Sequence, residues 1–145
     1  MENPTDFANT TRLAGSIETF SQLPDDCRLA RSAGVNLLIV LPERIGGFTE
    51  LLMPELAAPI VAWRPGERLM LPQAAETGTL LLHDVGGLSL HDQRYLVEWL
   101  ERAAGQTQVV STTPQPLLPL VQSGTFLARL YYRLNTVCVD LNVAV

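Results

Sequence analysis

The sequence predicts an α/β fold, in which a parallel sheet lies between two layers of helices. Short apolar runs alternate along the chain with segments of helical periodicity, and this order is typical of a parallel sheet with helices on both faces. The length of 145 residues suits one domain, and the apolar content of 47% is enough for a sizeable core. We therefore expect a three-layer sandwich.

Five strands are predicted from apolar runs whose lengths suit buried strands rather than helices. They cover residues 35–40, 59–63, 79–82, 108–111 and 136–141. The longest uninterrupted apolar runs are far shorter than the roughly 20 residues that span a bilayer. Together with the polar opening of the chain, this leads us to expect a cytoplasmic protein without membrane contact.

The clearest predicted helix covers residues 89–102. Ser89 is its expected N-cap, and Asp92 stands at the position that a capping box requires. Its core face repeats at helical spacing and holds Leu96, Trp99 and Leu100. Four further helices are predicted over residues 25–33, 47–56, 117–123 and 126–134, and residues 1–12 form a polar N-terminal tail.

The charge composition excludes several kinds of chemistry. All ten basic residues are arginines, so the chain has no lysine for a Schiff base or for gripping phosphate in a standard P-loop. The net charge of −5 argues against direct binding to DNA, which needs a basic face. Cys27 and Cys138 are too few for a disulfide framework, and neither has a nearby basic partner that would suggest a catalytic dyad.

Two sequence runs carry a family resemblance. Residues 77–100 read TGTLLLHDVGGLSLHDQRYLVEWL, and residues 126–135 read FLARLYYRLN. These runs resemble the AAA+ core, or sigma-54 interaction domain, of sigma-54-dependent transcriptional activators. The resemblance implies a P-loop NTPase fold of the AAA+ type with five parallel strands. Residues 13–145 then form a single degenerate AAA+ core domain, without the helical lid that follows the fifth strand in the family.

The expected phosphate-binding loop departs from the family pattern. A P-loop needs glycines that expose backbone N–H groups and a lysine that reaches the outer phosphates. The run LPERIGGF follows the first predicted strand, with Leu41 at the first glycine position and Gly47 at the lysine position. Glu43 adds a negative charge, and Pro42 removes a backbone donor. We therefore expect weak phosphate binding here.

The remaining catalytic positions of the family are altered as well. His83 and Asp84 replace the paired acids that hold magnesium and position water, and Pro114 replaces the sensor asparagine. Of the two arginines that the family presents to a neighbouring subunit's nucleotide, the first corresponds to Leu127 and the second to Arg133. The sequence thus predicts no ATPase activity and no resident cofactor.

These departures lead to two functional hypotheses. The first is a non-catalytic module that acts in transcriptional regulation through protein–protein interaction, with an AAA+ activator or the transcription machinery as partner. The family's GAFTGA loop, which contacts the sigma factor, is absent between Trp63 and Thr79. The alternative is a sensor that binds ATP or ADP with magnesium but does not hydrolyse it efficiently. Its remnant site would comprise Gly46, Gly47, Asp84 and, from a neighbouring subunit, Arg133. An evolutionary remnant without a role is a third possibility.

The two histidine-aspartate pairs allow both a structural and a functional interpretation. The pairs His83-Asp84 and His91-Asp92 could converge on a transition metal, but Asp92 has a capping role available, and no metal site is predicted.

Tyr131 and Tyr132 could stack on bases, but packing of their helix is the favoured reading on an acidic protein. Arg129 and Arg133 share a helix face, which is either solvated or docks to an acidic patch on a partner subunit.

Overall fold

A computed structural model of the chain describes residues 23–43, 48–103 and 106–141. These residues contain five strands: β1 (Leu37–Val40), β2 (Ile60–Trp63), β3 (Thr79–Leu82), β4 (Gln108–Thr113) and β5 (Val137–Asp140). All pair in parallel, in the order β2-β3-β4-β1-β5. The predicted five-stranded parallel sheet is confirmed. The predicted polar tail, residues 1–12, lies outside the described residues.

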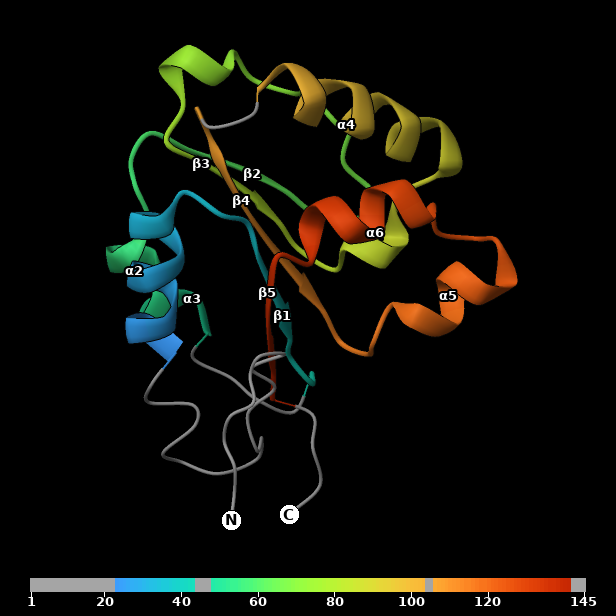
Figure 1. The fold of residues 1–145 in the computed structure, drawn as a ribbon, viewed down its shortest axis with the longest axis horizontal. Helices are drawn as coiled ribbons and strands as arrows, with labels where there is room; N and C mark the ends of the chain where they lie inside the picture. Colours follow the sequence, from blue (N-terminus) through green and yellow to red (C-terminus); the bar gives the residue numbers. More distant parts are fainter. Residues whose placement is uncertain (1–22, 44–47, 104–105, 142–145) are drawn as a thin grey trace.

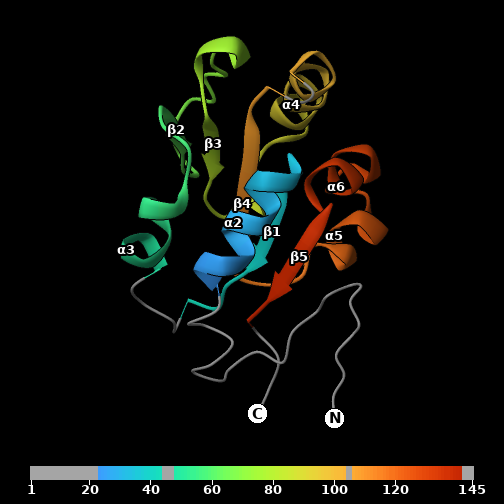
Figure 2. The same ribbon diagram turned by 60° about the vertical axis from the view of Figure 1, so that its left-hand side comes forward.

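Helices cover both faces of the sheet (Figure 2). α2 (Leu23–Ala33) and the short α3 (Phe48–Leu52) lie on one face, and α4 (Leu90–Arg102), α5 (Leu118–Ser123) and α6 (Ala128–Leu134) lie on the other. Strand residues alternate between two hydrophobic cores because successive side chains point to opposite faces. In β1, for example, Leu38 packs in the core beneath α4 and α6, whereas Leu37 and Ile39 pack beneath α2. The three-layer sandwich is confirmed.

The predicted features of α4 are confirmed in detail. The Ser89 hydroxyl accepts a hydrogen bond from the Asp92 amide at 3.1 Å, as an N-cap does. Leu96, Trp99 and Leu100 are all buried against the sheet. Because burial of such side chains supplies most of a helix's stability, this face fixes α4 in place.

Four of the five predicted strands have other bounds in the structure. β2 begins at Ile60 rather than residue 59, and β5 covers Val137–Asp140 rather than 136–141, so the bounds of these two differ by one residue. The other two differ by two residues. β1 begins at Leu37 rather than residue 35, because α2 closes in a Schellman motif at Gly34, whose φ is 72°. The Val35 amide donates to the Ala30 carbonyl in that motif. β4 continues to Thr113 rather than ending at 111, because Thr113 still pairs with Val40 of β1.

The predicted helix over residues 47–56 is also shorter in the structure. α3 ends at Leu52, and a 3-10 turn, η1 (Met53–Glu55), follows it. Pro54 lies in this turn and has no N–H to continue an α-helical ladder. Two further 3-10 turns that the sequence did not predict are η2 (Ala74–Glu76) and η3 (Val85–Gly87).

The other predicted helix bounds differ by one or two residues. α2 begins at Leu23, α5 at Leu118 and α6 at Ala128, where Leu117 and Leu127 are the N-cap positions of the last two. Among the described residues, no helix combines the length and the apolar character that a bilayer crossing requires.

Candidate functional site

The carboxyl edge of the sheet is where this class of fold binds ligands. Val40, Thr113 and Asp140 lie side by side at the ends of β1, β4 and β5. β3 ends two residues earlier in the register, at Leu82 opposite Ser111, and His83 and Asp84 follow it. The structure thus places Leu41, His83, Asp84 and Pro114, four positions at which the sequence departs from the family pattern, at one edge of the sheet.

The loop that follows β1 offers little to a phosphate group. The Leu41 amide donates to the Thr113 carbonyl at 2.8 Å, so it extends the sheet rather than facing a ligand. Pro42 is buried and has no N–H, and Glu43 is exposed. The predicted site residues Gly46 and Gly47 lie outside the described residues.

His83 is anchored to the neighbouring strand. Its amide donates to the Trp63 carbonyl at 2.9 Å, and its side chain is half-buried. Burial lowers the pKa of His83 below its ordinary value of 6.5, and the charge of Arg64 lowers it further, against a smaller opposing effect of Glu67. The imidazole is therefore neutral at neutral pH, and it adds no negative charge to hold a hard cation.

Asp84 turns the chain away from β3. Its φ of 49° lies in the left-handed region, which aspartate tolerates better than most residues. The Asp84 amide donates to the Thr112 hydroxyl at 3.0 Å, and the Asp84 carbonyl accepts from the Gly87 amide at 2.9 Å. The residue as a whole is exposed, which leaves its carboxylate as an oxygen ligand at this edge.

Arg133 lies at the opposite, amino edge of the sheet. The Asn36 side chain donates to the Arg133 carbonyl at 3.0 Å and accepts from the Val109 amide at 2.9 Å, so it joins α6 to the starts of β1 and β4. The structure therefore does not bring Asp84 and Arg133 together within one chain. That Arg133 completes such a site in a neighbouring subunit stays a prediction.

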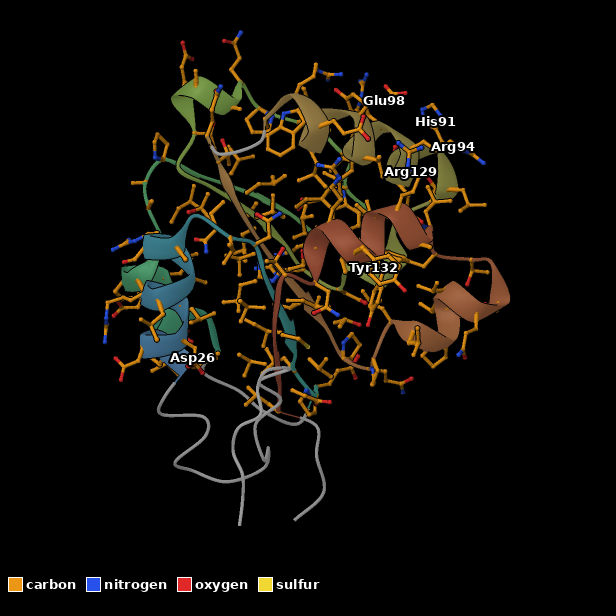
Figure 3. All side chains as sticks on the ribbon, in the orientation of Figure 1. Asp26, His91, Arg94, Glu98, Arg129 and Tyr132 are labelled. Atoms are coloured by element: carbon orange, nitrogen blue, oxygen red, sulfur yellow. The ribbon has the colours of Figure 1, made fainter. Side chains whose placement is uncertain are left out.

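A cavity of about 550 Å³ opens at this amino edge, between α4 and α6. Its lining includes Asn36, Glu101, Arg129, Tyr132 and Arg133. Both arginines are exposed, and both approach the Glu101 carboxylate, Arg129 at 2.8 Å and Arg133 at 3.6 Å. Figure 3 shows Arg129 at the junction of the two helices. The shared helix face is confirmed, and its positive charge is partly compensated by Glu101.

The tyrosine prediction is half correct. Tyr131 is half-buried and packs against the core, as expected. Tyr132 is 69% exposed, so the prediction that it packs inside is wrong. Leu130 and Leu134 of α6 face the core, and a residue two positions after Leu130 must lie on the other side of the helix. That spacing was the signal that could have identified Tyr132 as a surface residue.

The two histidine-aspartate pairs do not form a metal centre in the described part of the chain. No group of three or more His, Cys, Asp and Glu side chains there could hold a metal ion. His91 is exposed at the start of α4, and the Asp92 amide bonds to the helix cap.

The two cysteines are unsuited to nucleophilic catalysis. Burial is the main cause that raises the pKa of both thiols to about 11. Both thiols are therefore protonated at neutral pH, whereas the thiolate is the reactive form. Cys27 packs in the core beneath α2, and Cys138 packs against the core on the opposite face of the sheet.

Known proteins resemble this chain in both sequence and fold. The pathogenicity locus probable regulatory protein WtsA of Pantoea stewartii subsp. stewartii is 35% identical over 80 residues, which are 48% of this chain and 25% of that protein. The match thus spans a quarter of this curated relative. Crystalline NtrX from Brucella abortus, in complex with ADP, has a TM-score of 0.67 at 20% identity, over 90% of this chain and 37% of that one.

The P-loop NTPase domain of a sigma-54 activator from E. coli has a TM-score of 0.56 at 15% identity, over 87% of this chain and 96% of that one. These two structural likenesses establish the P-loop NTPase fold. The sequence model of the sigma-54 interaction domain matches residues 57–143, which is more than half of the chain. The chain therefore belongs to the sigma-54 interaction domain family.

Proposed function

We propose that this chain is a non-catalytic member of its family and regulates transcription by binding another protein. The observation that carries the proposal is the composition of the carboxyl edge. The Leu41 amide is used by the sheet, Pro42 has no amide proton, and Glu43 would repel phosphate. A half-buried neutral His83 stands where the family has a magnesium-binding acid. These residues bind and orient a nucleotide poorly, so efficient hydrolysis is not expected.

The amino edge supports a role in protein binding. Arg133 keeps an exposed side chain beside Arg129 and Tyr132, and Arg and Tyr are frequent anchors of protein interfaces. Family members present the equivalent arginine to a neighbouring subunit. We infer that this face docks to an acidic patch on an activator subunit of the same family.

The relatives support a regulatory setting. WtsA is a probable regulatory protein, and the family is defined by interaction with sigma-54. The family match begins at residue 57, beyond the loop that follows β1. The matched region therefore covers most of the α/β fold but not the loop at the phosphate-binding position. We propose a cytoplasmic protein that contacts the transcription machinery and does not itself bind DNA.

Complex formation with an intact sigma-54 activator from the same organism tests this proposal. The two proteins are mixed, and the mass of the complex is measured by size exclusion with light scattering. The wild-type chain should form a complex and change the activator's ATPase rate. Arg133→Ala should weaken the complex about tenfold or more, as loss of an interface anchor does.

Arg94→Ala is the matched control, since Arg94 is an exposed arginine on α4 that does not line the amino-edge cavity. It should leave the complex unchanged. The absence of any complex with the activators of that organism would count against the proposed function.

The alternative is an ATP or ADP sensor, and one observation favours it. Asp84 keeps an exposed carboxylate at the carboxyl edge, with its backbone held by Thr112. NtrX, which shares the fold, has been crystallised with ADP and with ATP. Calorimetry with magnesium and each nucleotide distinguishes the two hypotheses. A sensor must show heat of binding and a raised melting temperature, because a ligand that binds only the folded state stabilises it.

A further inference from the structure

Two neighbouring cavities lie along α4, away from the carboxyl edge, and the second of them meets the amino-edge cavity at Ala103. Their volumes are about 490 Å³ and about 380 Å³. The connection between β2 and β3 runs alongside α4 and forms their other wall (Figure 1). Both cavities are bordered by Leu71 and Tyr95, so they lie next to each other and form a shallow trough along the helix. We call this trough the α4 groove.

The length of the α4 groove follows from the helix. The first cavity is bordered by His91 and Tyr95, and the second by Tyr95, Trp99 and Arg102. At 1.5 Å per residue, the helix from His91 to Arg102 extends for roughly 16 Å. An extended peptide rises about 3.3 Å per residue, so roughly five peptide residues match this length. The Trp99 indole donates to the Pro72 carbonyl at 2.8 Å, which fixes the floor of the second cavity.

The wall opposite α4 resembles an unpaired strand. Residues 68–71 are in no helix or strand, and their backbone groups make no hydrogen bond within the described part of the chain. Their side chains alternate, since Leu69 is 6% exposed, Met70 is 68% exposed and Leu71 is half-buried. An extended segment with free N–H and C=O groups can pair with an added peptide strand, which gains main-chain hydrogen bonds.

The side chains of the α4 groove indicate the kind of peptide. Met70 and Tyr95 are exposed apolar surface, which suits apolar side chains of a ligand. Arg68 borders one cavity and Arg102 the other, so an arginine side chain lies at each end of the groove. Asp92, which borders the first cavity, is half-buried, whereas Arg68 is exposed.

We propose that the α4 groove binds an extended segment of a partner protein, about five residues long, with two apolar side chains and an acidic residue at each end. Alternate residues of an extended peptide point to the same side, so its two apolar side chains enter the two neighbouring cavities. Its backbone pairs with residues 68–71, and its two acidic side chains point to the open side, where the exposed side chains of Arg68 and Arg102 reach them. This inference rests on the proposed role as an interaction module, and it identifies the surface and the partner's chemistry.

The test uses the whole chain and a panel of fluorescein-labelled pentapeptides of the form Asp-X-Thr-X-Asp, where X is Leu, Val, Phe or Met. Fluorescence anisotropy should detect binding of at least one peptide with a Kd below about 1 mM. Tyr95→Ser should raise that Kd about tenfold or more, because Tyr95 borders both cavities. Leu90→Ser is the matched control, since Leu90 is 38% exposed on the same helix, Tyr95 is 40% exposed, and Leu90 borders neither cavity.

A second pair of variants tests the charges. Arg68→Glu should weaken binding of the peptide and reduce the salt dependence of that binding. Arg94 is an exposed arginine of α4 outside the groove, so Arg94→Glu should have little effect. A peptide with N-methylated backbone amides should bind more weakly if main-chain pairing is used. Hydrogen exchange should then show slower exchange of the Leu69, Met70 and Leu71 amides when the unmodified peptide is present.

The proposal is overturned if no peptide of the panel binds, or if Tyr95→Ser and Leu90→Ser bind alike. Either failure is distinguishable from failure of the proposed function. A chain that still forms a complex with an intact activator, but binds no peptide, keeps its regulatory role and loses only this surface.

Discussion

The two edges of the parallel sheet use their polar groups differently. At the amino edge, polar side chains connect strands to each other and to helices: Asn36 joins α6 and β4, and the Gln108 amide donates to the Val35 carbonyl at 2.9 Å. Nearby, the Thr107 hydroxyl bonds to the Thr77 carbonyl at 2.9 Å. At the carboxyl edge, the Leu41 amide extends the pairing of β1 with β4, the Thr112 hydroxyl accepts from the Asp84 amide, and the family's catalytic side chains are replaced.

The hydrogen bonds that hold the fold together are therefore made by other residues than those at the family's catalytic positions. The amino-edge bonds are made at the opposite ends of the strands from His83 and Asp84, so substitutions at the carboxyl edge do not remove them. Buried backbone groups must find hydrogen-bond partners in any member of the fold, whereas magnesium ligands are needed only for hydrolysis. The scaffold and the exposed face with Arg129 and Arg133 can therefore remain whatever side chains occupy the carboxyl edge.

The strongest test of this comparison removes Asn36. Asn36→Ala deletes two hydrogen bonds that join α6 to β4 and should lower the free energy of unfolding by about 2 kcal/mol. Urea unfolding measures this change. Asn135→Ala is the matched control: Asn135 is half-buried at the end of α6, and its side chain makes no hydrogen bond to the described residues. An equal loss of unfolding free energy in both variants would show that the two hydrogen bonds of Asn36 add no stability of their own.

A smaller effect is expected at the carboxyl edge as the pH falls. The pKa of His83 is below 6.5 in the folded chain, so the unfolded chain takes up the proton first as the pH drops. The contribution of His83 to the free energy of unfolding is fully present above pH 6.5. It is lost as the pH falls from 6.5 through the pKa of the folded chain. Unfolding of the wild type and His83→Gln should therefore be compared at about pH 7.5 and about pH 5.5. The wild type should lose more stability than the variant, and parallel losses would contradict the assignment.

The smallest expected stability effect is at Glu101. Glu101→Gln removes the partner of Arg129 and Arg133, but these side chains are exposed, so the free energy of unfolding should change by less than about 0.5 kcal/mol. The same variant should bind an acidic partner more tightly, because the two arginines keep their full charge. A large loss of stability with unchanged partner binding would assign the cluster to the fold rather than to docking.

The sheet and α4 could be predicted from the sequence because their signals are local. Thr79–Leu82 is an apolar run bounded by polar residues, and it is β3 without correction. The Ser89 cap and the spacing of Leu96 and Leu100 likewise depend only on neighbouring residues. The family resemblance supplied the expected positions of Asp84 and Arg133, but not their distance from one another.

The features that could not be predicted depend on contacts between distant segments. Asn36 has an ordinary turn composition around it, and its role appears only when β4 and α6 lie beside it. The α4 groove likewise needs residues 68–75 to lie along α4, and no sequence pattern indicates that pairing. By contrast, the break at Pro54 was visible in the sequence, since proline lacks the N–H of a continuing helix.

ATP turnover by the purified chain tests the central claim most directly. Phosphate release is measured with magnesium and ATP at about 1 mM, a concentration near the upper end of ordinary KM values, against the Asp84→Ala variant. If the carboxyl edge is non-catalytic, the wild type and the variant release phosphate at the same background rate. Turnover by the wild type that disappears in Asp84→Ala would contradict the account, because it would show that this edge still performs the family's chemistry.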